Sequence, residues 1–230
     1  MNFLETKVRE IVKETSDTYS FVLEIPEGME WKAGQHAMFK FKDHQVDEGD
    51  KPTRVFSVAS TMEDGFVMFT TRIAEPHTSF KEILLNKLQV GDTILMTQPI
   101  GNFNVHSEFK KSLIIAGGIG ITPIRSIFRH LQNENLENQQ FTVFYSDDRG
   151  EFAYVDTFEE IKKAMPNLDF HFISHRDEFN EKVDNYVKET LNEAEYLIAG
   201  SPGMNAFFSE KLQSMGVEKS NIFTDNFIGY

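Results

Sequence analysis

The chain has 230 residues, of which 40% are hydrophobic and 13% aromatic, so it can bury substantial cores and does not read as a disordered protein. Its 36 acidic residues outnumber 23 basic ones, and the formal charge of -13 disfavours binding to nucleic acid or to an anionic membrane surface. The sequence contains no cysteine, which excludes disulfides, thiolate-bound iron–sulfur clusters and a cysteine nucleophile within it.

The sequence shows no signal for export or membrane insertion. No apolar run reaches the ~18 residues of a membrane span, and the charged amino terminus MNFLETKVREIVKE lacks the apolar centre of a secretory signal. We therefore expect a cytoplasmic protein without a membrane partner.

The first half of the sequence has the apolar and polar alternation of β-strands, from residue 7 to about residue 103. Gly, Pro and acidic turns separate the alternating segments, which are residues 19–25, 37–42, 54–60, 65–73 and 92–98. One helix is predicted at residues 79–88, where Ser79 and Glu82 have the spacing of a capping box. This pattern predicts an antiparallel barrel or sandwich with one helix.

After the loop at residues 101–111, strands alternate with helices. Strands are predicted at residues 112–118, 141–146, 168–174, 195–201 and 221–227, and helices at residues 122–135, 155–165, 185–191 and 203–216. Such an order predicts a doubly wound parallel sheet with helices. We place the boundary near residues 104–111, which gives two domains, residues 1–106 and residues 107–230.

A glycine-rich turn follows the first strand of the second half. It contains Gly117, Gly118 and Gly120, and the helix after it has Thr122 as N-cap candidate and Pro123 in its first turn. Backbone N–H groups and the helix dipole favour an anion at such a turn, so a pyrophosphate would fit. A glycine turn that serves only to reverse the chain is the alternative.

A second turn of the same kind lies in YLIAGSPGMNAFF, where a strand again ends in small residues before a helix. Two such turns in one parallel sheet create a crevice at the carboxyl edge of the strands, which is where open sheets usually bind ligands. A nucleotide site is therefore predicted at this edge.

The strand RVFSVAS, residues 54–60, carries an arginine after an acid-rich loop. Alternation puts Arg54, Phe56 and Val58 on one face of the strand and Val55 and Ser57 on the other. Taken alone, an arginine before a β-branched strand is more often a surface residue than a ligand-binding one.

Five segments, in the same order, resemble motifs of the ferredoxin–NADP reductase superfamily. RVFSVAS resembles its flavin-binding R-x-[YF]-S motif, GGIGITP its nicotinamide-nucleotide motif and AGSPGM its C-G-P-x-x-M turn. WKAGQHAMF and QPIGNF resemble its P-G-Q strand and G-P-x-G-x-F turn, so the resemblance runs from about residue 31 to the end. It implies an FAD-binding β-barrel followed by an NAD(P)-binding α/β domain, here without a fused iron–sulfur domain.

The resemblance also assigns roles at the flavin. It implies that Arg54 pairs with the flavin pyrophosphate, that Phe56 lies against the isoalloxazine ring where the family usually has Tyr, and that Ser57 hydrogen-bonds near the reactive flavin N5. The helix after residue 78 would direct its amino end at the same pyrophosphate. Further implied flavin contacts are Val58, Arg72, Ile73, Thr78 and Ser79.

The nicotinamide cofactor is implied to face both glycine turns, through Gly117, Gly118, Gly120, Thr122, Pro123, Gly200, Pro202 and Met204. Ala199 stands where many relatives have a cysteine close to the nicotinamide, so no thiol can take part. Near the end of the sequence, Asp225 is the implied proton relay, and Phe227 or Tyr230 is implied to cover the flavin face. A frayed last strand is the alternative for Tyr230.

The segment YSDDRG bears on the choice between NADH and NADPH. A carboxylate favours the free 2′-hydroxyl of NADH, and an arginine favours the 2′-phosphate of NADPH. Asp147 and Asp148 stand beside Arg149, and Arg176 follows the next strand, so both cofactors stay open with a slight preference for NADH.

Together these expectations describe an FAD-dependent NAD(P)H oxidoreductase, a flavoprotein that transfers hydride from NADH or NADPH to FAD and electrons onward to a separate acceptor. The acceptor is expected to be ferredoxin, flavodoxin, free flavin or a small oxidant. The net charge would repel acidic proteins unless a local basic patch overrides it, formed by Lys81, Lys87, Lys110 and Lys111. Two alternatives remain: an NAD(P)H:flavin reductase that uses free flavin as its substrate, and a non-catalytic nucleotide-binding protein with an electron-relay or regulatory role.

No metal site is predicted. His171 and His175 are four residues apart, but their segment alternates as a strand, which separates them by about 13 Å and prevents shared coordination.

Overall fold

The computed structural model of the protein describes residues 2–134, 136 and 138–225. The chain divides into two compact units, and the division falls between Asn102 and Phe103. Each unit has its own sheet and its own hydrophobic core.

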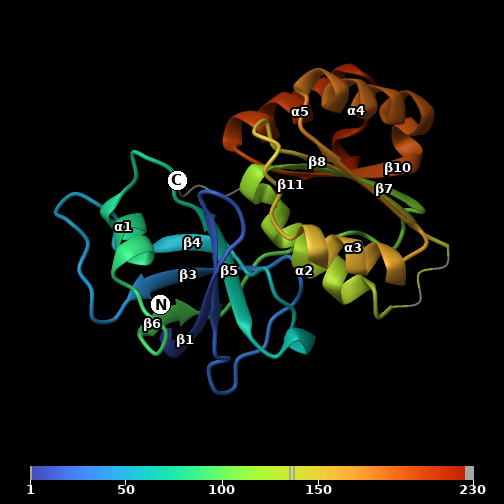
Figure 1. Ribbon diagram of the computed structural model, residues 1–230. Coiled ribbons are helices and arrows are strands. Elements are labelled where there is room, and N and C mark those ends of the chain that lie inside the picture. The colour runs from blue at the N-terminus through green and yellow to red at the C-terminus, as the bar shows by residue number, and fades with distance from the viewer. Residues whose placement is uncertain (1, 135, 137, 226–230) are drawn as a thin grey trace. The chain divides into compact units, whose positions relative to one another are not determined.

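The first unit is a six-stranded antiparallel sheet in the order β4-β3-β6-β1-β2-β5. Its strands are β1 (Phe3–Lys13), β2 (Thr18–Leu23), β3 (His36–Phe41), β4 (Arg54–Ser57), β5 (Val67–Arg72) and β6 (Thr93–Thr97). The two outermost strands come together just after β4, where the N–H of Ala59 donates to the carbonyl of Met68 at 2.7 Å. The sheet therefore nearly closes into a barrel, which confirms the predicted architecture (Figure 1).

Phenylalanine rings fill the barrel. Phe21 and Phe39 both pack against Phe69, with ring centroids 5.0 and 4.6 Å apart. Helix α1 (Ser79–Asn86) adds Phe80, Ile83 and Leu84 to the same core, and a short 3₁₀ turn, η1 (Met62–Asp64), precedes β5. The single predicted helix is present, although it ends two residues earlier than expected.

Two details of the first unit differ from the sequence-based expectation. Strand β1 begins at Phe3, before the predicted start of alternation at residue 7, and its alternate residues Thr6 and Val8 are the buried ones. The N-cap of α1 is Thr78 rather than Ser79: its backbone is extended, and its hydroxyl oxygen accepts from the N–H of Lys81 at 3.4 Å. The identity of the cap therefore follows the backbone conformation of residue 78.

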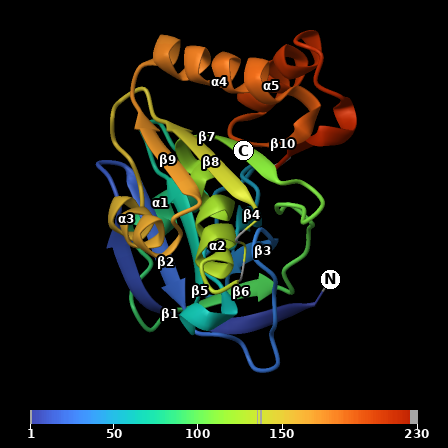
Figure 2. The ribbon, with the colours of Figure 1, turned by 90° about the vertical axis from the view of Figure 1, so that its right-hand side faces the viewer.

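The second unit is a five-stranded parallel sheet in the order β11-β10-β7-β8-β9. The strands are β7 (Lys111–Gly117), β8 (Gln140–Ser146), β9 (Leu168–Ile173), β10 (Ala194–Ala199) and β11 (Ile222–Thr224). The helices are α2 (Ile121–Leu131), α3 (Val155–Ala164), α4 (Arg176–Thr190) and α5 (Pro202–Ser214), with 3₁₀ turns η2 (Gly118–Gly120), η3 (Leu191–Glu193) and η4 (Lys219–Asn221). Helices α2 and α3 cover one face of the sheet and α4 and α5 the other, as predicted (Figures 1 and 2).

The strand order of this sheet reverses between β7 and β10. From β7 the chain builds outward to β8 and β9, and it then returns to the opposite side of β7 to form β10 and β11. The loops that leave β7 and β10 diverge at such a reversal, which is where doubly wound sheets bind ligands.

Three helices of the second unit begin elsewhere than predicted, α5 by one residue. Helix α2 has Gly120 as its N-cap, and Thr122 lies inside the first turn with its hydroxyl donating to the carbonyl of Ile119 at 2.7 Å. Helix α4 begins at Arg176, well before the predicted residue 185, because its buried side chains Phe179 and Val183 already lie on the face that packs on the sheet.

Across residues 2–134, 136 and 138–225, no helix combines the length and hydropathy that crossing a membrane requires. The same residues contain no group of three or more His, Asp or Glu side chains placed to hold a metal ion.

Candidate functional site

The two glycine-rich turns meet at the carboxyl edge of the parallel sheet. A Cβ atom added to Gly120 would lie 2.0 Å from the carbonyl oxygen of Ala199, so the turn after β7 touches the end of β10. Met204, in the first turn of α5, fills the space beside both turns, because a Cβ on Gly117 or Gly200 would fall within 2.5 Å of its sulfur. Glycine is required at residue 120, where the neighbours are backbone atoms, whereas a side chain at residue 117 or 200 would have to displace Met204. The structure thus brings the two predicted turns together at the switch point.

The turn after β7 presents its backbone rather than side chains. Gly118 has φ of 52°, which favours glycine, and an added Cβ there would meet no atom within 4 Å. The side chains of Thr122 and Pro123 are buried in the unit. An anion at this turn would therefore be held by backbone N–H groups and by the positive end of α2.

The end of the described chain lies at the same edge. Ser201 caps α5 by accepting from the N–H of Met204 at 3.2 Å, and Pro202 occupies the first turn. The N–H of Asp225 donates to the carbonyl of Ile198 at 2.9 Å, so buried Asp225 lies next to the end of β10. Phe227 and Tyr230, the expected ring-covering residues, fall outside the described residues.

A carboxylate and an arginine are paired in the turn after β8. Oδ1 of Asp147 accepts from the N–H and Nε of Arg149 at 2.9 and 3.2 Å, and its Oδ2 accepts from the guanidinium at 3.1 Å. Asp148 is exposed and forms an ion pair with Arg176 at 2.7 Å. The four residues that the sequence singled out for cofactor choice thus form two acid–base pairs.

On the barrel, hydrogen-bond donors converge at the amino end of α1. The guanidinium of Arg54 is nine-tenths buried and lies over the ring of Phe80 at 5.1 Å. The hydroxyl of Ser79 and the N–H of Phe80 point to the same place as this guanidinium, where they donate to the carboxylate of Asp50 at 2.7 and 3.0 Å. A guanidinium, a hydroxyl and a helix N-terminus are the donor set that suits a phosphate, so the residues present fit the expected flavin pyrophosphate.

Two further cations surround this helix terminus. Burial lowers the pKa of Lys81, and the nearby charges of Arg54 and Arg72 lower it further. Arg72 is half-exposed and forms an ion pair with Asp17 at 2.8 Å. Three cations, Arg54, Lys81 and Arg72, thus gather around the position predicted for the flavin phosphates, and the carboxylates of Asp50 and Asp17 offset part of their charge.

The remaining predicted flavin contacts lie on or beside β4. The ring of Phe56 stacks on Phe69, with centroids 4.8 Å apart and planes 7° from parallel. Ser57 is buried and pairs across the strands with His36, whose pKa is lowered by burial. The side chains of Val58 and Ile73 belong to the barrel core, against which Phe56 packs.

Two carboxylates that accept several hydrogen bonds were not among the predicted site residues. Asp50 is one, and its acidic loop gave no signal that separates it from solvated acids. Glu195, fully buried on β10, is the other: it accepts from Ser112 at 2.7 Å and from the N–H of His106 at 3.0 Å, and its other oxygen lies 2.7 Å from Nδ1 of His106. Burial raises the pKa of Glu195, and these hydrogen bonds oppose that rise.

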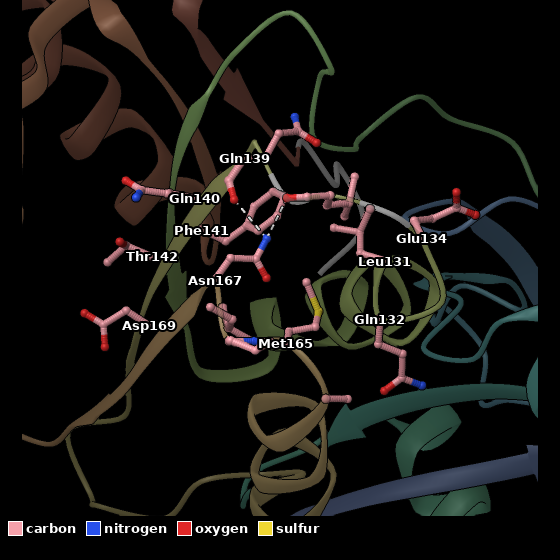
Figure 3. A pocket seen from close by; sticks show the side chains of 14 residues that line it. Leu131, Gln132, Glu134, Gln139, Gln140, Phe141, Thr142, Met165, Asn167 and Asp169 are labelled. Carbon is pink, nitrogen blue, oxygen red and sulfur yellow. Dashed lines mark hydrogen bonds between the residues drawn. The ribbon is translucent and has the colours of Figure 1, made fainter.

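The second unit also has a pocket of about 810 Å³, drawn in Figure 3. It lies where β8 and β9 begin, between the last residues of α2 and α3, and is lined by Leu131, Gln132, Glu134, Leu136, Gln139, Gln140, Phe141, Thr142, Ala164, Met165, Pro166, Asn167, Leu168 and Asp169. Strands β8 and β9 start here, so the pocket is at the opposite sheet edge from the glycine turns. Its amides serve the loop itself, since Asn167 donates to the carbonyls of Leu136 and Gln139.

Comparison with known proteins identifies both units. Residues 5–105 match the family model described as an oxidoreductase FAD-binding domain, and residues 114–210 match that of an oxidoreductase NAD-binding domain. A component of the Na⁺-translocating NADH-quinone reductase of Actinobacillus succinogenes is 28% identical over 200 residues, which cover 76% of this chain and 49% of that protein. The protein of the same name in Haemophilus ducreyi is 26% identical over 90% of this chain and 63% of its own length, so the chain spans about half to two thirds of these relatives.

Solved structures share the fold over nearly the whole chain. The ferredoxin reductase of carbazole 1,9a-dioxygenase superposes with a TM-score of 0.78 at 24% identity, covering 99% of this chain and 70% of that one. Ferredoxin-NADP⁺ reductase from Plasmodium falciparum gives 0.80 at 17% identity, with 98% and 97% covered. Both domain matches and these folds agree with the motifs in RVFSVAS and GGIGITP, and the chain belongs to the ferredoxin–NADP reductase superfamily, as an oxidoreductase with an FAD-binding and an NAD-binding domain.

Proposed function

We propose that the chain transfers hydride from NADH or NADPH to FAD and passes the electrons to a separate acceptor. The observation that carries the proposal is the presence, in one chain, of an anion-binding helix terminus on the barrel and two touching glycine turns at the switch point of the parallel sheet. The flavin supplies the redox chemistry when bound, and the chain supplies binding, orientation and control of protons.

The predicted residues on the barrel and at the sheet edge have distinct roles in this proposal. Arg54 and the amino end of α1 bind the flavin phosphates, and the partly buried ring of Phe56, which stacks on Phe69, contacts the isoalloxazine. Ser57 donates a hydrogen bond at flavin N5. Asp225 holds or moves a proton at the carboxyl edge of the sheet.

NADH is the preferred reductant in this proposal. Asp147 neutralises Arg149 through three hydrogen bonds, so the arginine charge that would attract a 2′-phosphate is already taken. The curated relatives are named for NADH, which supports the same choice.

The acceptor is proposed to be a molecule other than this chain. The sequence has no cysteine, so no thiolate-held cluster within it can take the electrons. The relatives' names point to a quinone reductase and to a ferredoxin reductase, which makes a protein partner one candidate. Lys111, part of the expected basic patch, is paired with Glu193 at 3.1 Å, which weakens the case for an acidic protein there.

A second function, reduction of free flavin as a substrate, is favoured by one observation. The donors expected to bind the flavin phosphates already hold the carboxylate of Asp50, so a flavin must compete for them. Competition of this kind weakens binding and favours exchange of the flavin between turnovers.

The proposal is tested by mixing the purified protein with FAD and then with NADH or NADPH under anaerobic conditions. We expect loss of the oxidised-flavin absorbance with either nucleotide, and faster with NADH. Retention of the yellow colour through desalting would identify FAD as a resident cofactor, and loss of the colour with catalytic turnover would identify it as a substrate. A flavin-binding chain that no nicotinamide reduces would instead be a non-catalytic protein.

The variant Arg54→Gln tests the barrel site directly. We expect it to weaken FAD binding by about tenfold or more, because a charge-assisted hydrogen bond contributes roughly 1.5–3 kcal/mol. Arg9→Gln is the matched control: Arg9 lies on the same unit, is exposed, and donates to the carbonyl of Gly65, away from α1. Equal FAD affinities in the two variants would contradict the assignment.

A further inference from the structure

The carboxylate of Asp50 occupies the anion position at the amino end of α1. Its Oδ2 accepts from the hydroxyl of Ser79 at 2.7 Å and from the N–H of Phe80 at 3.0 Å. Its Oδ1 accepts from the guanidinium of Arg54 and from its neighbour Lys51, whose N–H lies 2.7 Å away. Four donors thus serve one carboxylate, which is only 15% exposed.

The same donors cannot serve this carboxylate and a phosphate at once. The hydroxyl of Ser79 and the N–H of Phe80 are already directed at Oδ2 of Asp50, and a phosphate placed beside an ionised carboxylate would be repelled. Burial raises the pKa of Asp50, but the hydrogen bonds from Ser79, Phe80, Arg54 and Lys51 together lower it well below the usual range. The carboxylate therefore stays ionised. The repulsion is therefore present at neutral pH.

The position of Asp50 in the chain allows it to leave. It lies in the connection between β3 and β4, residues 42–53, and follows Gly49, whose φ is 89° and whose surroundings are open. A hydrogen bond from the backbone N–H of Asp47 to the hydroxyl of Ser79, at 2.9 Å, also ties this connection to α1. Displacement of Asp50 therefore moves a surface loop and leaves the barrel strands in place.

We propose that Asp50 determines which flavins the barrel accepts, by competing with the flavin phosphate for Arg54 and the amino end of α1. Riboflavin has no phosphate and binds without displacing Asp50, whereas FMN and FAD must displace it. This inference rests on the proposed function, because it takes the barrel as the flavin site. It makes Asp50 a selectivity residue that lowers the advantage phosphorylated flavins would otherwise gain from four preformed donors.

Dissociation constants for riboflavin, FMN and FAD, measured by quenching of flavin fluorescence, test the proposal in wild type, Asp50→Ala and Asp50→Asn. In Asp50→Ala we expect FMN and FAD to bind about tenfold more tightly. This is the gain expected if wild type has Asp50 displaced from α1 in roughly one tenth of its molecules and the variant has the anion position open in nearly all. The dissociation constant for riboflavin in Asp50→Ala should stay within about twofold of the wild-type value, since riboflavin has no phosphate to compete with Asp50. Asp50→Asn keeps the side-chain volume and should give a smaller gain of the same sign.

Asp47→Ala is the matched control. Its side chain is exposed on the same loop, and its hydrogen bond to Ser79 uses the backbone, so the variant removes one negative charge without opening the anion position. We expect its three flavin affinities to match wild type. A general electrostatic effect would instead make Asp47→Ala and Asp50→Ala equivalent, which would overturn the proposal.

Inorganic pyrophosphate gives a readout that needs no flavin. We expect it to raise the melting temperature of the barrel in Asp50→Ala, followed through the fluorescence of buried Trp31, and to leave that of wild type nearly unchanged. NADH affinity reports that the second unit remains folded in every variant. Weaker FMN and FAD binding in Asp50→Ala, or equal changes for all three flavins, would overturn the role of Asp50 alone. Absence of flavin binding in every variant would overturn the proposed function as well.

Discussion

The contact between the two glycine turns predicts a large effect for a single methyl group. Gly120 has φ of -61° and ψ of -12°, a backbone conformation that alanine adopts without strain, so the substitution Gly120→Ala isolates the effect of close packing. Its Cβ would lie 2.0 Å from the carbonyl oxygen of Ala199 and 2.7 Å from the N–H nitrogen of Gly200. Both neighbours are backbone atoms at the end of β10, and they cannot rotate away as a side chain would.

The size of the effect follows from these distances. The oxygen of Ala199 must retreat by about 1 Å before the contact reaches 3.0 Å, below which real Cβ atoms are essentially never found. Forcing an extra methyl into a packed interior costs about 1–3 kcal/mol, and a backbone neighbour puts Gly120→Ala at the upper end. The two turns also separate, so we expect nicotinamide-nucleotide binding to weaken by at least about tenfold.

Two other glycines provide controls of known geometry. In Gly118→Ala the added Cβ would meet no atom within 4 Å, but the residue has φ of 52°. Backbone strain alone should therefore lower the free energy of unfolding by about 1–2 kcal/mol. Gly203→Ala, also without a neighbour within 4 Å and inside α5, should be neutral or stabilising by up to about 1 kcal/mol. From most to least stable, the expected order of the variants is therefore Gly203→Ala, Gly118→Ala and Gly120→Ala.

Urea unfolding with two probes measures these differences. Trp31, the single tryptophan, is buried in the barrel with Nε1 donating to the carbonyl of Ser60, so its fluorescence reports the first unit. Far-ultraviolet circular dichroism reports both units, and most of the helix lies in the second. We expect Gly120→Ala to shift the dichroism transition and spare the fluorescence transition. If Gly120→Ala unfolds like Gly203→Ala, the two turns do not touch in solution and the reasoning fails.

The buried Glu195 makes stability depend on pH. Its pKa is raised by burial, so the folded state holds more protons than the unfolded state, and its contribution to stability falls as pH rises from 4.5, the ordinary value, through the folded-state pKa. Urea titrations between pH 4.5 and about 7 should show wild type losing stability relative to Glu195→Gln, and parallel curves would contradict this sign. Separately, Asp147→Ser should release Arg149 and lower the NADH to NADPH ratio of kcat/KM by about tenfold, while Glu160→Ser, exposed on α3, leaves it unchanged. A ratio that does not move in Asp147→Ser would remove that carboxylate as the discriminator.

The sequence was sufficient for the architecture because each unit has its own periodicity. Residues 112–118 read as one apolar run since β7 is central in a parallel sheet and is covered on both faces. The barrel strands alternate because one face packs on the phenylalanine core and the other faces outward. Helix α4 was placed too late because its first half is mostly charged, although the four-residue spacing of Phe179, Val183 and Val187 indicates a helix there.

The candidate site was less predictable where it depends on contacts between distant residues. Ser79 was expected to cap α1, yet its hydroxyl serves Asp50, 29 residues away along the chain. Glu195 likewise finds its hydrogen-bond donor in Ser112, 83 residues away. An acid in a polar loop and an acid at the start of a strand look alike in sequence, because the partners that bury them come from elsewhere in the fold.

The net charge of the chain is negative, whereas the two candidate sites, at the amino end of α1 and at the glycine turns, present hydrogen-bond donors. Over more than about 8 Å, salt screens the excess of acidic residues, whereas buried Arg54 and the backbone N–H groups of the turns act at hydrogen-bond distance. Small anions such as dinucleotides can therefore bind despite a charge of -13. A large acidic acceptor would instead meet many surface charges at once, and its approach would be slowed by repulsion. For this reason a neutral or small acceptor fits the charge distribution better than an acidic electron carrier does.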